Sequence, residues 1–309
     1  MKNKVTIVGA GNVGATTTHW LAAMNISDVI LLDIPQMEKM PMGKALDLMQ
    51  SGPVFGFDTQ VYGTNDYADT KDSDIVVVTA GVPRKPGMTR EDLVQTNQRI
   101  ITDVMGKALD ASPNAVFIIV TNPLDTMTYL ALKVSGLPRE RCFGQAGVLD
   151  SARFRTFLAR ELNVSVENVQ ASVLGGHGDE MVPLVRYSTV AGVPIGELLP
   201  AERINAIVER TRKGGGEIVE LLKTSAYYAP GASVAKMVEA ILKDKKLVVP
   251  CSAYLNGEYG LTDICFGVTA KLGAKGIEQI YEYKLNDAER AMFDKSVSLI
   301  RGTMGALKF

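Results

Sequence analysis

The sequence predicts an α/β protein in which a doubly wound parallel sheet of the Rossmann type precedes a mixed α+β domain. Short runs rich in Val and Ile alternate with helix-length amphipathic segments, and a glycine-rich motif directly follows the first run. This regular alternation stops near residue 145. We therefore expect two domains, residues 1–145 and residues 146–309.

The first domain is expected to alternate strands and helices. Brief apolar runs, typical of strands buried on both faces, are residues 5–8, 29–32, 75–79 and 116–121. Amphipathic segments of helical length lie between or after them, at residues 13–24, 42–49, 91–109 and 124–134. Because strand–helix–strand units place their strands parallel with right-handed crossovers, this order predicts one parallel sheet.

The second domain has a less regular pattern. Helices are expected at residues 151–162, 201–222, 234–242 and 288–307, the last weakened by two glycines. Strands are expected at residues 169–174, 181–187 and 247–254, and an Asn-Gly turn signal follows the last of them. This mixture predicts α+β architecture.

The composition excludes several classes of protein. Lys plus Arg number 33 against 34 for Asp plus Glu, so a net charge of −1 gives no bulk attraction to nucleic acid or to an anionic membrane. Three widely spaced cysteines without a CxxC pair indicate neither a disulfide framework nor a metal site. With no signal-peptide core and no apolar run near the roughly 18 residues of a membrane span, we expect a cytoplasmic protein.

A glycine-rich motif follows the first predicted strand and opens the first predicted helix: Gly9, Ala10, Gly11, Asn12, Val13 and Gly14. In a GxGxxG loop the first glycine permits a tight turn, the second lets backbone approach a pyrophosphate, and the third lets helix and strand pack closely. The phosphates of a dinucleotide would then lie at a helix N-terminus, where free N–H groups favour negative charge.

Asp33 follows the second predicted strand, at the spacing of about 20 residues typical of the acid that binds the adenosine ribose hydroxyls. A carboxylate there repels a 2′-phosphate, so the expected cofactor is NAD rather than NADP. The alternative is a glycine-rich turn followed by a solvated aspartate.

The chain has two histidines. His19 lies inside the first predicted helix and is expected to be an ordinary helix residue. His177 lies in the sequence GGHGD, where glycines on both sides indicate unusual backbone torsions and leave the imidazole open to a ligand. Taken alone, a histidine in a glycine-rich turn is more often structural or solvated than catalytic.

Four motifs in this order, GAGNVG, VTNPLD, LDSARF and GGHGD, resemble those of the lactate/malate dehydrogenase family, and the resemblance spans essentially the whole chain. It implies oxidation of a 2-hydroxy acid, with hydride transferred to NAD. It also implies that His177 is the base for the hydroxyl proton and that Asp150 of LDSARF orients the imidazole. The alternative role of Asp150 is a helix N-cap.

The resemblance assigns further contacts. Arg153 is expected to bind the substrate carboxylate beside the reacting carbon, because a guanidinium can make two parallel hydrogen bonds to it; the alternative is a surface arginine. Asn122 is expected to contact substrate and cofactor, or else to be a turn residue before proline. Further candidates are Asn97 and Thr121 for the cofactor and Ala226 for the substrate.

Residues 80–90 follow the third predicted strand and contain glycines, prolines and three basic residues. They resemble the mobile lid of the family, with Arg90 as the arginine that polarises the substrate carbonyl. Arg84 matches the specificity position, where members acting on malate have Arg and members acting on lactate have Gln. Because an enclosed second carboxylate needs a cation, Arg84 favours malate and oxaloacetate as substrates. The alternative is a solvated basic surface loop.

The resemblance also implies a homo-oligomer, either a dimer or a tetramer, without nucleic-acid or membrane partners. Three other functions stay open. A lactate or other 2-hydroxy acid dehydrogenase would not require Arg84. A non-catalytic NAD(H)-binding sensor would need the glycine loop and Asp33 but not His177. A scaffold would keep only the fold.

Overall fold

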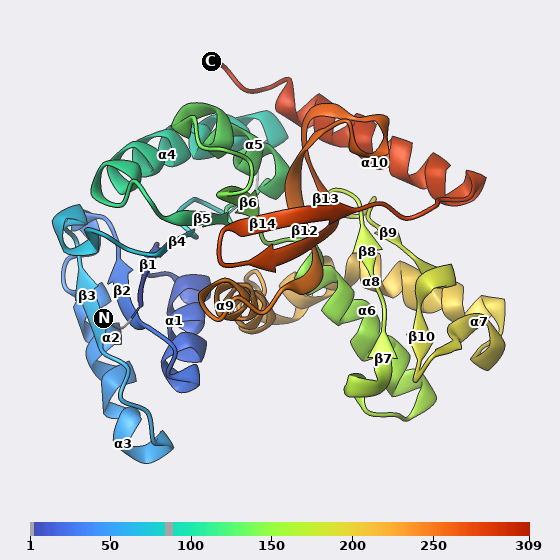
Figure 1. The fold of residues 1–309 in the computed structure, drawn as a ribbon, viewed down its shortest axis with the longest axis horizontal. Helices are drawn as coiled ribbons and strands as arrows, with labels where there is room; N and C mark the ends of the chain where they lie inside the picture. Colours follow the sequence, from blue (N-terminus) through green and yellow to red (C-terminus); the bar gives the residue numbers. More distant parts are fainter. Residues whose placement is uncertain (1–2, 84–88) are drawn as a thin grey trace.

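The computed structural model describes residues 3–83 and 89–309 (Figure 1). Within these residues nine strands form one sheet, in the order β14-β13-β12-β6-β5-β4-β1-β2-β3. Pairs among β1 to β6 are parallel, whereas β12 pairs antiparallel with β6 and with β13, and β13 with β14. The predicted α/β class, with a doubly wound parallel sheet followed by a mixed region, is confirmed.

The elements have the following bounds. The strands of the large sheet are β1 Lys4–Val8, β2 Asp28–Leu32, β3 Val61–Thr64, β4 Ile75–Val78, β5 Val116–Ile119, β6 Cys142–Gly144, β12 Leu247–Asn256, β13 Thr262–Gly273 and β14 Gly276–Tyr281. The short strands are β7 Val169–Gln170, β8 Val173–Leu174, β9 Val182–Pro183, β10 Thr189–Val190 and β11 Val193–Pro194. The α-helices are α1 Asn12–Met24, α2 Met40–Gln50, α3 Gly52–Phe55, α4 Arg90–Ala111, α5 Leu124–Ser135, α6 Gly147–Leu162, α7 Ile195–Leu198, α8 Ala201–Leu222, α9 Tyr228–Leu242 and α10 Asp287–Met304. In the described part of the chain, no helix combines the length and apolar character needed to cross a membrane.

The parallel strands are the Val- and Ile-rich runs that the sequence predicts to be buried. β4 and β5 are buried along their whole length, and so is β1 after its first residue. Helices α4 and α5 cover one face of the sheet, and α1 and α9 cover the other (Figure 1). The predicted strands in the first domain match β1, β2, β4 and β5 to within two residues.

The strand order reverses beside β1, which pairs with β2 on one side and β4 on the other. In a doubly wound sheet such a switch point leaves a crevice at the carboxyl ends of the strands, where ligands bind. Gly9 directly follows β1, and residues 79–83 follow β4. The glycine loop and the segment after β4 therefore meet at this crevice.

Several elements in the second half differ from the prediction, including α9, which begins at Tyr228 rather than at residue 234. Helix α6 begins at Gly147, four residues before the predicted start. Gly147 packs closely against Pro250, where an added Cβ would lie only 2.5 Å from the Pro250 side chain. The predicted strand at residues 169–174 is divided into β7 and β8, because β7 pairs with β10 whereas β8 pairs with β9. The predicted strand at residues 181–187 is β9 followed by a 3₁₀ turn, Val185–Tyr187.

The large sheet continues across residue 145. β12 pairs with β6 at Ser252 and Gly144, and the largest hydrophobic cluster contains side chains from both halves, including Ile7 and Phe266. The predicted domain boundary at residue 145 stays a prediction, since both the sheet and this cluster extend over it.

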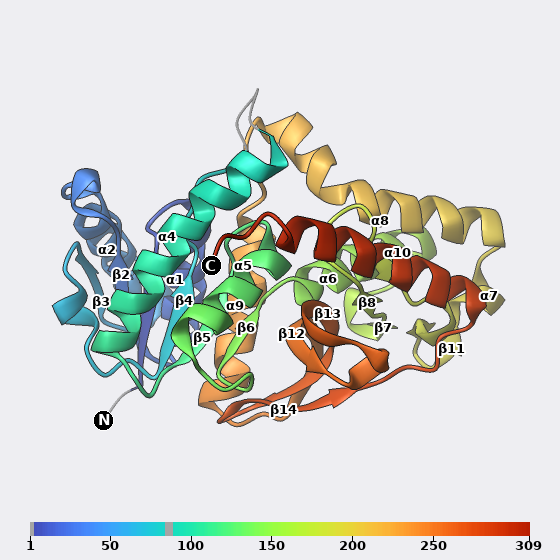
Figure 2. The same ribbon diagram turned by 90° about the horizontal axis from the view of Figure 1, so that it is seen from above.

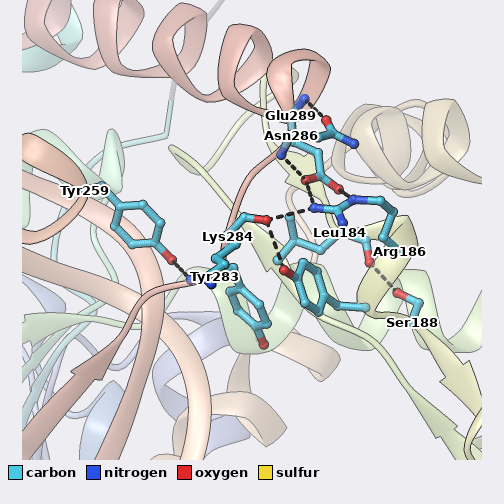
Figure 3. Close-up of polar contacts among 9 residues, drawn as sticks. Leu184, Arg186, Ser188, Tyr259, Tyr283, Lys284, Asn286 and Glu289 are labelled. Atoms are coloured by element: carbon cyan, nitrogen blue, oxygen red, sulfur yellow. Dashed lines mark hydrogen bonds and ion pairs between the residues drawn. The ribbon is translucent and has the colours of Figure 1, made fainter.

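Helix α10 runs along the C-terminal half of the molecule and is fixed at its N-terminus (Figure 2). The Asn286 side chain accepts the Glu289 N–H at 2.8 Å, and the Glu289 carboxylate accepts the Asn286 N–H at 2.9 Å. Arg186 donates to both oxygens of Glu289, at 3.0 and 2.7 Å (Figure 3). This network holds in place the helix whose Ser296 contacts the turn before His177.

Candidate active site

A buried carboxylate connects two residues with predicted catalytic roles. His177 Nδ1 lies 2.8 Å from Asp150 Oδ2, and Arg153 Nη1 donates to Asp150 Oδ1 at 3.2 Å. The side chains of Asp150, Arg153 and His177 are 3%, 12% and 17% exposed. Asp150 therefore holds an imidazole with one oxygen and a guanidinium with the other, largely away from water.

The first turns of α6 produce this arrangement. Asp150 and Arg153 are three residues apart, so they lie on the same face of the helix. Asp150 lies inside the first turn of α6 and is not its N-cap residue, which is Ala146. The alternative roles of helix N-cap for Asp150 and of surface residue for Arg153 are therefore both wrong.

The pKa of His177 results from opposing effects. Burial lowers it, and the neighbouring Arg153 guanidinium lowers it further. The Asp150 carboxylate raises it by charge and by hydrogen bonding, with a smaller contribution from Asp125. The net pKa lies above the ordinary value, so the site favours the imidazolium that forms when His177 accepts a proton.

Arg153 offers a free donor beside His177. Its Nε is buried and has no hydrogen-bond partner among the described residues. A cavity of about 250 Å³ is lined by Arg153, His177, Asn122 and Ala226, together with parts of α8. Gly214 on α8 passes close to Arg153, where an added Cβ would lie 3.3 Å from Cδ. Because the cationic guanidinium of Arg153 lines this cavity, the cavity is suited to an anionic ligand.

Asn122 and Ala226 both line the cavity of Arg153, and their contacts to substrate stay predictions. Asn122 is exposed, follows β5 and lines both this cavity and a neighbouring one of about 540 Å³, and His177 also lines both. Ala226 precedes α9 and lines the smaller cavity, where its small side chain leaves room for a ligand. The turn-residue role of Asn122 and a binding role are therefore compatible.

The glycine loop has the geometry that its motif predicts. Gly9 has a φ of +108°, and a Cβ added to Gly14 would lie 1.8 Å from the Gly9 carbonyl oxygen. A Cβ added to Gly11, by contrast, would have no neighbour within 4 Å. Helix α1 begins without a side-chain cap, so its first N–H groups are available to phosphate oxygens. The residues present thus fit the diphosphate of a dinucleotide.

The Asp33 carboxylate is hydrogen-bonded to this loop. Its Oδ2 accepts the Ala10 N–H at 2.7 Å, and its Oδ1 accepts the Ile34 N–H at 2.8 Å. Asp33 is therefore not a freely solvated side chain. Each oxygen has a second lone pair, so the carboxylate can also accept ribose hydroxyls.

The side chains of two predicted cofactor contacts form hydrogen bonds to the backbone. The fully buried Asn97 accepts the Val82 N–H at 2.9 Å and donates to the Asn122 carbonyl at 2.6 Å. The Thr121 hydroxyl donates to the Ala80 carbonyl at 2.6 Å. Both side chains connect the segment after β4 to the segment after β5, and their role toward the cofactor stays a prediction.

The two arginines of the predicted lid are not placed by the structure. Arg84 lies outside the described residues, and the side chain of Arg90, the first residue of α4, is also outside the description. The start of α4 is well defined, because Thr89 and Asp92 form a reciprocal capping box with two bonds of 3.0 Å.

Two buried polar residues at this site were not among those predicted from the sequence. Asp125, from the VTNPLD motif, accepts the backbone N–H of His177 at 2.8 Å. Gln145 follows β6 and lines the cavity of Arg153, and its buried Nε2 has no partner among the described residues. The motif itself was a signal for Asp125, and the position after a parallel strand was a signal for Gln145.

Comparisons with known proteins agree with this architecture. Residues 3–144 match the family model of the lactate/malate dehydrogenase NAD-binding domain, and residues 147–306 match that of the alpha/beta C-terminal domain. A relative from Roseiflexus sp. (strain RS-1), named malate dehydrogenase, is 59% identical over 100% of this chain and 99% of its own length.

Solved structures include enzymes named for either substrate. The malate dehydrogenase of Salinibacter ruber has a TM-score of 0.94 and 50% identity, covering 98% of this chain and 97% of its own. A second solved structure is a lactate dehydrogenase of Cryptosporidium parvum complexed with lactic acid and nicotinamide adenine dinucleotide. It has a TM-score of 0.95 and 42% identity, covering 99% of this chain and 98% of its own. The backbone is thus shared by both kinds of enzyme. The chain belongs to the lactate/malate dehydrogenase family.

Proposed function

We propose that this chain catalyses the reversible oxidation of (S)-malate to oxaloacetate with NAD⁺ as hydride acceptor. The observation that carries the proposal is the cavity lined by both His177, held by Asp150, and the guanidinium-bearing Arg153. This arrangement suits a secondary alcohol next to a carboxylate. Relatives that are 55–59% identical over nearly the whole chain, all named malate dehydrogenase, support the same substrate.

His177 moves the hydroxyl proton. Because Nδ1 is bound to Asp150, Nε2 is the nitrogen that faces substrate and accepts the proton during oxidation. Asp150 fixes the tautomer and stabilises the imidazolium, and the same group returns the proton in the reverse direction. When bound, the nicotinamide of NAD supplies the hydride acceptor.

The glycine loop and Asp33 are the residues that would hold the cofactor. The diphosphate would lie over Gly11 at the start of α1, and the Asp33 carboxylate would accept the ribose hydroxyls. A 2′-phosphate would bring negative charge beside Asp33, which favours NAD over NADP.

The two carboxylates of malate need two cationic partners. We assign the carboxylate beside the reacting carbon to Arg153, whose Nε lacks a partner among the described residues, and the distal one to Arg84. Arg90 is assigned the polarisation of the carbonyl oxygen. A carboxylate enclosed without a cation costs several kcal/mol, so Arg84 distinguishes malate from lactate in this proposal.

A substrate panel tests the proposal. The pure protein is mixed with oxaloacetate, pyruvate or a longer 2-oxo acid, each with NADH or NADPH, and absorbance of the reduced cofactor is followed. Oxaloacetate with NADH is expected to react fastest. Faster reaction of pyruvate would indicate a lactate enzyme, and no reaction with any substrate would indicate a binding protein.

Arg84→Gln tests the specificity assignment. We expect it to lower kcat/KM for oxaloacetate by about 10³–10⁵ and to narrow the gap to pyruvate, because the distal carboxylate loses its cation. Lys85→Gln is the matched control, since it removes a neighbouring positive charge, and it should keep the preference. Full preference for oxaloacetate in Arg84→Gln would contradict the assignment.

We also propose a cytoplasmic homo-oligomer. Helices α2 and α3 expose large apolar side chains, with Leu46, Val54 and Phe55 being 54%, 84% and 77% exposed, which is typical of a surface covered by a partner. All three cysteines are buried free thiols, in keeping with a reducing compartment. Light scattering would distinguish monomer, dimer and tetramer.

A further inference from the structure

Asp125 is a buried carboxylate that the mechanism above does not use. It lies in the first turn of α5 and is 1% exposed. Its Oδ2 accepts the backbone N–H of His177 at 2.8 Å, and its Oδ1 accepts the Ser252 hydroxyl of β12 at 2.6 Å. A single carboxylate therefore connects α5, β12 and the turn that carries His177.

Burial of such a group has a cost that must be offset. Burial raises the pKa of Asp125 above its ordinary value, and the Ser252 hydroxyl and the His177 N–H, which favour the anion, offset only part of this effect. The N-terminus of α5 also favours negative charge in its first turn. A neutral side chain of similar size would avoid the desolvation cost, so the carboxylate calls for an explanation beyond packing.

We propose that Asp125 is a positioning residue for the reaction, which fixes the backbone of His177 and acts on its imidazole as a second carboxylate behind Asp150. This inference rests on the proposed function, because it takes His177 to be the base. Asp150 approaches from α6 and holds the ring at Nδ1, while Asp125 approaches from α5 and holds the main chain of the same residue.

The charged groups around His177 determine how its pKa responds to a substitution. Asp150 and Arg153 face His177 from α6, and Asp125 faces it from α5. The cavities that His177 lines are also lined by Asp179 and Glu180 of the same turn, Arg212 of α8 and Lys295 of α10. Asp125 itself faces His177, Asp150 and the Ser252 hydroxyl. Burial raises the pKa of the Cys265 thiol of β13, and Asp125 adds a smaller contribution in the same direction. Removing the Asp125 charge should therefore disfavour the imidazolium of His177.

The same turn contains a neutral counterpart. Ser296 Oγ on α10 accepts the N–H of Gly176, the residue before His177, at 3.0 Å. Two successive backbone N–H groups are thus bound, one by a carboxylate and one by a hydroxyl. Comparing substitutions of Asp125 and Ser296 therefore separates the effect of a negative charge on His177 from the effect of a hydrogen bond to the backbone of the turn.

The experiment uses the full chain with Asp125→Asn, Ser252→Ala and the matched control Ser296→Ala. Asparagine can keep its oxygen on the His177 N–H while its NH₂ faces Ser252, whose hydroxyl can accept as well as donate. The substitution therefore removes the charge with little change of shape. The His177 pKa is read by NMR of histidine-labelled protein, and His19, the other histidine of the chain, is the internal reference.

We expect Asp125→Asn to lower the His177 pKa by about 0.5 or more and to lower kcat/KM for oxaloacetate about tenfold, because the imidazolium loses a neighbouring anion. Ser252→Ala should produce a smaller shift in the same direction, since losing the hydroxyl donor disfavours the Asp125 anion. Ser296→Ala should leave the pKa unchanged. NADH affinity should be the same in all three variants.

An unchanged His177 pKa in Asp125→Asn overturns the proposal, and so does an equal shift in Ser296→Ala. If Asp125→Asn does not fold, an unchanged pKa in Ser252→Ala overturns it instead. Because the titration requires no turnover, wild-type protein that is inactive on oxaloacetate would contradict the proposed function while the titration still decides the role of Asp125.

Discussion

The glycine loop and the turn that carries His177 differ in what holds them. The loop, residues 9–14, lies within one strand–turn–helix unit and depends mainly on its glycine backbone, with Asp33 accepting the Ala10 N–H and Lys44 donating to the Ala10 carbonyl. The turn, residues 175–179, depends on polar side chains from three helices, among them Asp125 of α5, Asp150 of α6 and Ser296 of α10.

This difference predicts two kinds of sensitivity to mutation. In the loop, adding a single carbon atom should be damaging, and the consequence should depend on which glycine receives it. At the turn, the shape of a side chain should matter less than its charge or its capacity to carry a proton.

His177→Asn should have the largest effect. We expect it to lower kcat for oxaloacetate by about 10³ or more, because asparagine cannot transfer the proton, while NADH binding measured by fluorescence stays close to that of wild type. His19→Asn is the matched control, because His19 is exposed on α1, and it should remain fully active. Full activity of His177→Asn would exclude His177 as the base.

Gly14→Ala and Gly11→Ala form a pair that tests the loop. At Gly14 the new Cβ would overlap the Gly9 carbonyl, so we expect Tm to fall by more than about 5 °C. At Gly11 the Cβ would meet no protein atom but would occupy the space of the diphosphate, so Tm should stay within about 2 °C while the NADH Kd rises about 10- to 100-fold. Wild-type affinity in Gly11→Ala would mean that the diphosphate lies elsewhere.

The pH dependence should show the smallest effect. Reduction of oxaloacetate needs protonated His177, whose pKa is raised. The kcat/KM for oxaloacetate reduction should therefore be constant below that pKa and fall about tenfold per pH unit above it. The kcat/KM for malate oxidation should rise with pH below the pKa and be constant above it. Steady-state rates across pH provide the test, and Gly11→Ala should keep the same midpoint, because the loop does not contact His177. A midpoint below the ordinary histidine pKa would contradict the role of Asp150.

Local pattern was sufficient for β1, β2, β4 and β5 but not for β3 and β6 of the parallel half or for several later strands. β6 has only three residues and is recognisable as a strand only through its neighbours β5 and β12. β13 contains Gly267, which weakens a strand pattern in sequence. In the structure that glycine is required, because an added Cβ would lie 2.1 Å from the Gly175 carbonyl oxygen.

The site shows the same limit. Gly9, Gly11 and Gly14 could be interpreted from their spacing, whereas assigning roles to His177, Asp150 and Arg153 needed the resemblance to a family. Neither motif spacing nor the family resemblance identified roles for Asp125 and Gln145, because the role of a buried polar group depends on what surrounds it in space. The Ser252 partner of Asp125 is separated from it by 127 positions in the sequence.

The continuous sheet has a consequence for engineering the enzyme. The edge of β6 is covered by β12, and the apolar cluster beneath it includes Phe266 of the C-terminal half. An isolated cofactor half would present an open strand edge and an uncovered apolar surface, a combination that promotes aggregation. Chimeras that exchange cofactor halves between relatives would therefore have to match the surface of β12 as well as the junction near residue 145.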